Sequence, residues 1–198
     1  MPDYRDAFYL VGNSEKPVVL ASGSRTRADM LHSAGLAVEI RKPAIDESEF
    51  KHSLRADGAS AAEAAVFLAE MKANTISRTL PDALVIGADQ MLEIEREWLD
   101  KPEDRNSAAA HLRRLSGKRH SLVSAVVVSV GGTRIWHNID TANMQMRPLS
   151  DDFIDAYLNV VGNQVFETVG AYRLESVGAQ LFISVEGDFF TVLGLPLL

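Results

Sequence analysis

The chain has 198 residues, 46% of them hydrophobic, and we expect one domain over residues 1–198, with residues 1–16 as an N-terminal extension. The formal net charge of −7 disfavours nucleic-acid binding, because the surface as a whole would repel a polyanion. The lack of cysteine excludes disulfides, thiolate metal sites and a cysteine nucleophile.

The opening segment, MPDYRDAFYLVGNSEK, carries acidic residues and lacks the long apolar core of a secretory signal. No run approaches the roughly 18 apolar residues that a membrane span needs. We therefore expect a cytoplasmic protein that does not bind a membrane.

The next part of the chain predicts a strand, a helix, a second strand and a loop. Their ranges are 18–22, 24–34, 37–41 and 42–50. Arg25 and Arg27 fall in the first turn of the helix, where its dipole disfavours cations. Either they meet an anion such as a phosphate chain, or they reach into water. In the loop, Asp46 and Glu47 are a solvated acidic pair or ligands of a hard divalent cation.

The strand-to-helix junction contains Ser22-Gly23-Ser24. Backbone N–H groups, two hydroxyls and a glycine are the parts of an anion cradle. The same composition also makes an ordinary turn.

A long amphipathic helix follows over residues 62–76, announced by the capping-box spacing of Ser60 and Glu63. Lys72 lies in this helix with apolar neighbours, so its stem should cross packed surface. A single lysine is otherwise most often a solubilising group.

Residues 83–87 form an apolar run, as expected of a strand buried on both faces. The run delivers Asp89 at its carboxyl end, where open α/β folds hold ligands. An ordinary strand-ending aspartate is the alternative. Residues 91–95 alternate and are expected to pair with the chain near Trp98 as a hairpin.

The second half predicts two helices, a hairpin and a late strand. The helices are residues 104–115 and 150–161, the hairpin joins 121–130 to 133–146 through a glycine pair, and the last strand is 181–185. Strands and helices are interspersed, so the predicted class is α/β with a mixed central sheet flanked by helices.

Several sharper motifs are absent. Gly117-Lys118 lacks the earlier glycine and the following Ser or Thr of a phosphate loop. The five histidines show no metal-type spacing, which disfavours zinc.

Eight short stretches, in order, resemble the Maf family of nucleoside triphosphate pyrophosphatases, also described as septum formation inhibitors. They are residues 20–24 with the arginines after them, 46–47, 69–73, 87–90, 99–102, 115–120, 169–175 and 186–197. The resemblance covers nearly the whole chain and implies a Maf/ITPase-like fold. It also implies hydrolysis of a nucleoside triphosphate to a monophosphate and pyrophosphate with Mg²⁺ or Mn²⁺, and a homodimer.

Carried over by position, the resemblance makes Asp89 the proton acceptor that activates water. The residues implied to contact substrate are Ser22, Arg25, Arg27, Lys72 and Lys101 at the phosphates and Glu175 at the base. Glu47 and Asp89 would hold the metal.

Arg25-Thr26-Arg27 replaces the Pro-Arg-Arg of many members, so one phosphate contact is either lost or supplied by Arg25 from a shifted position. Gln90 and Glu175 resemble the branch associated with 7-methyl-GTP, whereas Ser176 fits neither branch. A carboxylate would favour the cationic 7-methylguanine ring. The dTTP and UTP branch, and a nucleotide-binding regulator of cell division with little hydrolysis, are the alternatives.

Overall fold

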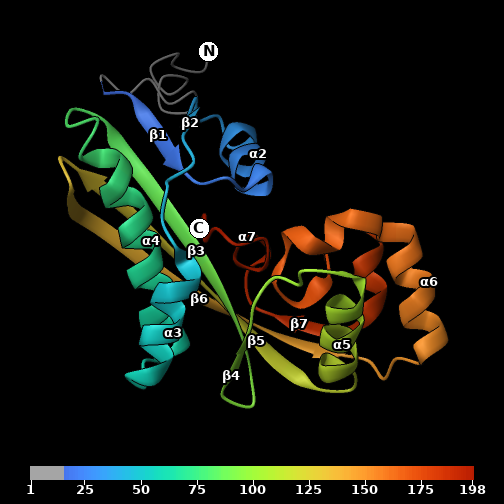
Figure 1. Ribbon diagram of the computed structural model, residues 1–198. Helices are drawn as coiled ribbons and strands as arrows, with labels where there is room; N and C mark the ends of the chain where they lie inside the picture. The colour runs from blue at the N-terminus through green and yellow to red at the C-terminus, as the bar shows by residue number, and fades with distance from the viewer. Residues whose placement is uncertain (1–15) are drawn as a thin grey trace, which may run out of the picture. The chain divides into compact units, whose positions relative to one another are not determined.

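The computed structural model describes residues 16–198, and the predicted N-terminal extension lies outside them except for Lys16. In the described part, helices flank a seven-stranded sheet with the order β2-β1-β3-β5-β6-β7, and β4 pairs with β3 (Figure 1). β1 is parallel to both of its neighbours, and β4 is antiparallel to β3. The predicted α/β class with a mixed sheet is confirmed.

The elements have the following bounds. The strands are β1 (Val18–Ala21), β2 (Glu39–Ile40), β3 (Leu84–Ile94), β4 (Glu97–Leu99), β5 (Arg119–Val130), β6 (Thr133–Met146) and β7 (Phe182–Glu186). The α-helices are α2 (Arg25–Ser33), α3 (Glu47–Ala56), α4 (Ala61–Ser77), α5 (Arg105–Leu115), α6 (Asp151–Val161) and α7 (Phe189–Val192). The 3₁₀ turns are η1 (Gly162–Glu167), η2 (Val169–Ala171) and η3 (Val177–Leu181).

The chain divides into two compact units, each made of two segments. Within the described residues, unit 1 is residues 16–89 and 125–139, and unit 2 is residues 90–124 and 140–198. β3, β5 and β6 each contribute residues to both units. The single domain expected for the whole chain stays a prediction.

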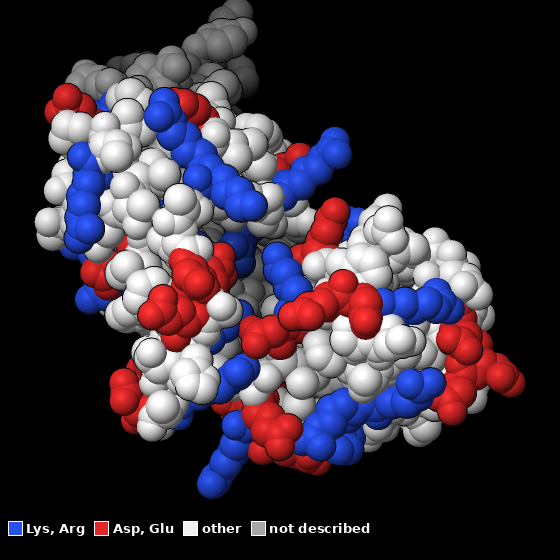
Figure 2. Space-filling view, viewed as in Figure 1, with Lys and Arg blue, Asp and Glu red and all other residues white. Residues whose placement is uncertain are grey.

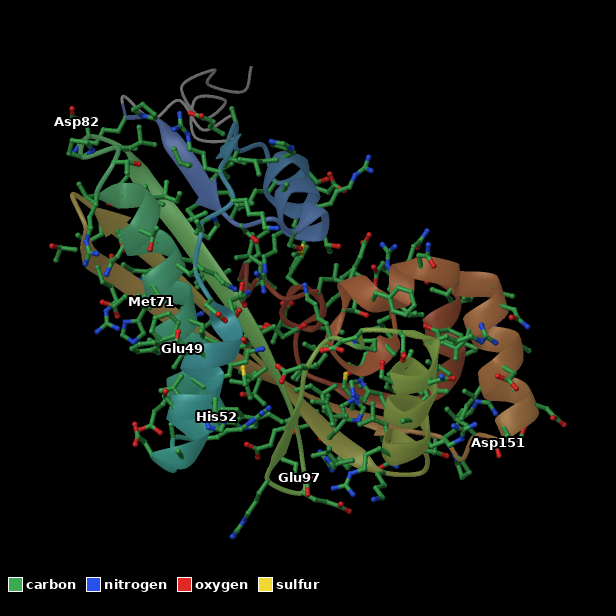
Figure 3. The ribbon with its side chains drawn as sticks, in the orientation of Figure 1. Glu49, His52, Met71, Asp82, Glu97 and Asp151 are labelled. Carbon is green, nitrogen blue, oxygen red and sulfur yellow. The ribbon has the colours of Figure 1, made fainter. Side chains whose placement is uncertain are left out.

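In unit 1, α4 begins with the predicted capping box between Ser60 and Glu63. Its buried residues recur every three or four positions, so one face packs against the sheet. They are Ala61, Ala64, Ala65, Leu68, Ala69, Lys72, Ala73 and Ser77. α3 lies beside α4, as Figure 3 shows for the segments carrying Glu49 and Met71, and Phe50 contacts Phe67 with ring centroids 5.5 Å apart.

Gly87 lets α4 approach β3 closely. A Cβ atom at this position would lie 2.1 Å from the backbone oxygen of Ala69 and 2.8 Å from the nitrogen of Ala73. Only a residue without a side chain fits there. The contact fixes which turn of α4 faces the middle of β3.

Unit 2 has its own core, built where α5, α6 and the 3₁₀ turns pack together and against the sheet. Its largest buried side chains include Leu92, Leu112, Leu122, Met144, Met146 and Leu158. His120 and Tyr172 form a buried polar contact within this core, with Nε2 2.7 Å from the hydroxyl oxygen. Unit 2 therefore has a hydrophobic core of its own.

Two local predictions are wrong. Residues 47–50, expected in a loop, begin α3, because Asp46 caps the helix and accepts the N–H groups of Ser48 and Glu49. Asp89 does not end a strand, because the expected strands 83–87 and 91–95 are one continuous β3. The hairpin near Trp98 is confirmed, with Leu92 opposite Leu99.

The glycine pair joins β5 to β6, its neighbour in the sheet, as the hairpin prediction required. Gly131 and Gly132 both have positive φ, at 56° and 81°. Such values are those of the tight turns that join antiparallel strands. Among residues 16–198, no helix is both long enough and apolar enough to cross a membrane.

Candidate active site in unit 1

Asp89 lies in the middle of β3 and faces α4. Alternate residues of a strand share a face, so Asp89 points to the same side as Gly87, where α4 packs closest. Lys72, on α4, is therefore brought to Asp89, and its Nζ lies 2.6 Å from Asp89 Oδ1. Both residues are 5% exposed.

Lys72 binds a second carboxylate. Its Nζ lies 2.9 Å from Oε2 of Glu47, the first residue of α3. One ammonium group therefore joins Glu47 and Asp89, which are far apart in the sequence. A buried charge of this kind is tolerated because it has oppositely charged partners.

The two oxygens of the Asp89 carboxylate have different surroundings. Its Oδ2 is buried and accepts no hydrogen bond from residues 16–198. A buried carboxylate oxygen without a partner is uncommon in native proteins and indicates a place for a ligand. With the carboxylate of Glu47 held next to the same ammonium group, the donors fit a hard cation such as Mg²⁺ or Mn²⁺. The residues implied by the family resemblance therefore suit the implied metal.

Arg27 is a second buried cation in this part of the protein, and it is 9% exposed. Its Nη1 donates to the backbone oxygen of Ala88 at 2.8 Å and to Ser22 Oγ at 3.4 Å. Burial lowers the pKa of Arg27, and the charges of Asp89 and Glu47 oppose that shift. The guanidinium group thus holds the peptide next to Asp89.

The parallel register of β1 and β3 explains how Ser22 reaches this place. Ala21 is paired with Gly87, so the chain leaves β1 beside Ala88 and Asp89. Ser22 Oγ then accepts the N–H of Ser24, and Ser24 caps α2 by accepting the N–H of Arg27. The junction is thus an ordered helix start, and its role as an anion cradle stays a prediction.

The two arginines of α2 have different surroundings. The side chain of Arg25 is 92% exposed and its nearest carboxylate is Asp29, at 4.0 Å. The alternative in which the side chain reaches into water is confirmed for Arg25, and the phosphate contact of Arg27 stays a prediction. Arg27 turns inward and Arg25 reaches into water.

The acidic pair also divides. Hydrogen bonds from the Ser48 hydroxyl, and then from the Glu49 N–H, lower the pKa of Asp46. Asp46 is the N-terminal cap of α3, whereas the Glu47 carboxylate contacts the ammonium group of Lys72. Among residues 16–198, no group of three or more acidic or histidine side chains is gathered into a ready metal cage. A metal at Glu47 and Asp89 would draw its other ligands from substrate or water.

The remaining predicted residues belong to unit 2. Lys101 is exposed and follows β4. Glu175 Oε1 accepts a hydrogen bond from Arg173 Nε at 2.8 Å. The substrate contacts assigned to Lys101 and Glu175 stay predictions.

Gln90 has a contact set that the sequence did not reveal. Its side chain points to the other face of β3 from Asp89, by the alternation of the strand. Its amide nitrogen lies 3.0 Å from Ser124 Oγ and within hydrogen-bond distance of the backbone oxygens of Thr191 and Val192. Gln90 therefore anchors α7. No motif in the sequence indicated this contact, because it joins residues about half the chain apart.

One face of the protein carries both signs of charge. On the face shown in Figure 2, Lys and Arg side chains lie among Asp and Glu side chains across residues 16–198. This mixture is consistent with local, buried cations at the candidate site rather than an extended basic surface.

Comparison with known proteins identifies the family. The chain matches the family described as Maf-like protein over residues 17–198. It is 52% identical over 180 residues to a nucleoside triphosphate pyrophosphatase of Paramagnetospirillum magneticum, covering 91% of this chain and 93% of that protein. It is 50% identical over 184 residues to a 7-methyl-GTP pyrophosphatase of Rhizobium meliloti, covering 92% of each. The chain therefore belongs to the Maf-like protein family.

Proposed function

We propose that this protein hydrolyses a nucleoside triphosphate to a nucleoside monophosphate and pyrophosphate. The observation that carries the proposal is the buried, unbonded Oδ2 of Asp89 beside the cations Lys72 and Arg27. Relatives with about half of their residues identical are named as nucleoside triphosphate pyrophosphatases, which supports the same reaction class.

In the proposed reaction Asp89 acts as the general base. Water adds to the α phosphorus, the α–β phosphoanhydride bond breaks, and the bridging oxygen leaves with pyrophosphate. The Asp89 carboxylate takes the proton that the water loses, a role that typically contributes roughly 10²–10⁴-fold to a rate.

The phosphate chain needs cations, because a triphosphate carries close to four negative charges. Ser22, Arg25, Arg27, Lys72 and Lys101 are the residues proposed to contact it. Positive groups placed at the leaving pyrophosphate lower the barrier by stabilising the charge that develops there. Arg27 also keeps the Ala88 carbonyl, and with it the start of Asp89, in place.

Glu47 and Asp89 are the proposed holders of Mg²⁺ or Mn²⁺. When bound, such an ion neutralises phosphate charge and polarises the bond to be broken. The donor set suits it, since carboxylate oxygens and substrate phosphates are the usual ligands of Mg²⁺.

We propose 7-methyl-GTP as the favoured substrate, with Glu175 beside the base. Methylation at N7 makes guanine cationic, and a carboxylate would favour that ring by Coulomb attraction. Because Arg173 binds Glu175 at 2.8 Å, part of this attraction is offset before any substrate arrives. The expected preference is therefore modest, and dTTP or UTP hydrolysis is the alternative.

The test measures pyrophosphate release from 7-methyl-GTP, GTP, UTP and dTTP with Mg²⁺ or Mn²⁺. The wild type should act fastest on 7-methyl-GTP, and Asp89→Asn should lose at least about 100-fold. Asp82→Asn, the same acid-to-amide change at the exposed residue labelled in Figure 3, is the matched control and should keep full activity.

Three results would argue against parts of this proposal. Full activity of a folded Asp89→Asn protein would remove Asp89 as the base. Faster turnover of UTP or dTTP would replace the base preference. Tight triphosphate binding without pyrophosphate release by the wild type would favour the nucleotide-binding regulator instead.

A further inference from the structure

The ammonium group of Lys72 holds together the two carboxylates that are proposed to bind the metal. Nζ lies 2.6 Å from Asp89 Oδ1 and 2.9 Å from Glu47 Oε2. These are short, charge-assisted contacts, and the Lys72 side chain is 7% exposed. Lys72 is thus a fixed cation inside the site.

The carboxylates would repel each other without a cation between them. Asp89 is buried, so its charge needs a partner in the folded protein whether or not a metal is bound. Lys72 contacts both carboxylates and satisfies that need through one oxygen of each.

Lys72 is also one of the residues proposed to contact substrate phosphate. An ammonium group has three N–H donors, and two of them are directed at Asp89 and Glu47 in this arrangement. A divalent ion bound to the same carboxylates would repel the ammonium group and supply the charge that it now supplies. The two cations therefore compete for one pair of carboxylates.

We infer that Lys72 is an internal placeholder for the metal, holding Glu47 and Asp89 together until a divalent cation displaces its ammonium group toward the substrate phosphates. The inference rests on the proposed function in one respect, which is that substrate phosphates are the groups that the displaced Lys72 ammonium group contacts next. It predicts that metal entry frees Lys72, so that metal and triphosphate strengthen each other's binding.

The first experiment measures Mn²⁺ binding to the whole protein without nucleotide, by electron paramagnetic resonance of the free ion. Lys72→Met keeps the length of the side chain and removes the competing charge, so Mn²⁺ should bind at least about tenfold more tightly. Lys118→Met is the matched control, because Lys118 is paired with Glu95 in unit 2 and its loss should leave the affinity unchanged.

A second measurement separates displacement from a simple effect of charge. Acetylation of lysines by an amine-reactive ester, read by mass spectrometry, should be slow at Lys72 in the metal-free wild type and several-fold faster with saturating Mg²⁺. Lys118 should be acetylated at the same rate in both conditions, because its partner Glu95 is not among the proposed metal ligands.

The third measurement concerns the coupling between ligands. The α,β-methylene analogue of GTP cannot be cleaved at the α–β position, so its binding can be measured with and without Mg²⁺. Mg²⁺ should tighten that binding in the wild type more than in Lys72→Met, which has no ammonium group to release.

The inference is overturned if Lys72→Met binds Mn²⁺ no more tightly than the wild type, or if neither protein binds it at millimolar concentration. Unchanged acetylation of Lys72 at saturating Mg²⁺ would also overturn it. None of these measurements depends on turnover. A protein that gives all three expected results but releases no pyrophosphate would refute the proposed reaction and still support the role of Lys72 as a placeholder.

Discussion

His120 is a buried titratable residue whose charge the folded protein does not accommodate. It is almost fully buried in unit 2, where its Nε2 meets the Tyr172 hydroxyl and its ring lies near Tyr172 and Phe182. Burial lowers the pKa of His120 from 6.5 to about 4. Since the folded pKa is depressed, the unfolded chain binds the proton first as the pH falls.

The free energy of unfolding should therefore fall as the pH is lowered from about 6.5 to 4, because the unfolded state binds more protons throughout that window. The loss from this residue alone is about 3 kcal/mol. Urea unfolding of the whole protein, followed between pH 7.5 and 4, measures it.

His120→Gln cannot titrate, so its stability should depend less on pH than that of the wild type across the same window. The exposed His52, labelled in Figure 3, provides the control substitution His52→Gln, which should keep the wild-type slope. Parallel curves for His120→Gln and wild type would show that the pKa of His120 is not lowered in the folded protein.

Single residues also show where sequence reasoning ends. The sequence identified Asp89 and Lys72 separately, from an acidic residue after an apolar run and a lysine among apolar neighbours. Their 2.6 Å contact was not predictable, because it depends on which turn of α4 faces β3. Likewise, the sequence placed Arg25 and Arg27 in one helical turn but could not tell which of them turns inward.

At the scale of elements, the packing of α4 on β3 at Gly87 positions the site. A Cβ atom there would overlap the backbone of Ala69 and Ala73, so Gly87→Ala must push the helix and strand apart. We expect unit 1 to lose about 2 kcal/mol of stability, within the range known for overpacked cores. Lys72 moves with the helix away from Asp89 and competes less with a metal there, so the variant should also bind Mn²⁺ more tightly.

Denaturant unfolding and Mn²⁺ titration of the Gly87→Ala protein measure the two effects. Gly23→Ala is the control for stability, since a Cβ atom at position 23 would meet only the flexible Lys42 side chain at 3.4 Å. If Gly87→Ala unfolds at the same denaturant concentration as Gly23→Ala, the close approach does not constrain the packing.

Element boundaries follow the strength of their local signals. The capping box at Ser60 and Glu63 correctly indicated the start of α4, since both of its hydrogen bonds form. α3 was missed because its cap, Asp46, was interpreted as part of an acidic loop and none of its residues is buried. β3 was split at Asp89, because a charged residue that is buried beside a lysine looks in the sequence like the end of a strand.

The class of the whole molecule was predictable, because apolar runs, helix caps and a glycine turn are local features that recur along the chain. The pairing of distant segments was not. Glu47 meets Lys72 although the sequence assigned them to a loop and a helix, and Gln90 meets the backbone of α7 about a hundred residues later. Such contacts are products of the packed chain and leave no periodic trace.

A metal that binds only the folded protein stabilises it as a whole. At a Mg²⁺ concentration tenfold above its dissociation constant, this linkage contributes about 1.4 kcal/mol, or a rise in melting temperature of about 3 to 6 °C. The rise should vanish on adding EDTA. It should also shrink strongly in Glu47→Gln, which keeps the shape of the side chain but loses the charge that Lys72 now binds.

The matched control is Asp46→Asn, one residue earlier. This variant should keep the rise, because the Asp46 carboxylate faces the N–H groups of its own helix. An equal response of the two variants to Mg²⁺ in scanning calorimetry would place the metal elsewhere in the protein.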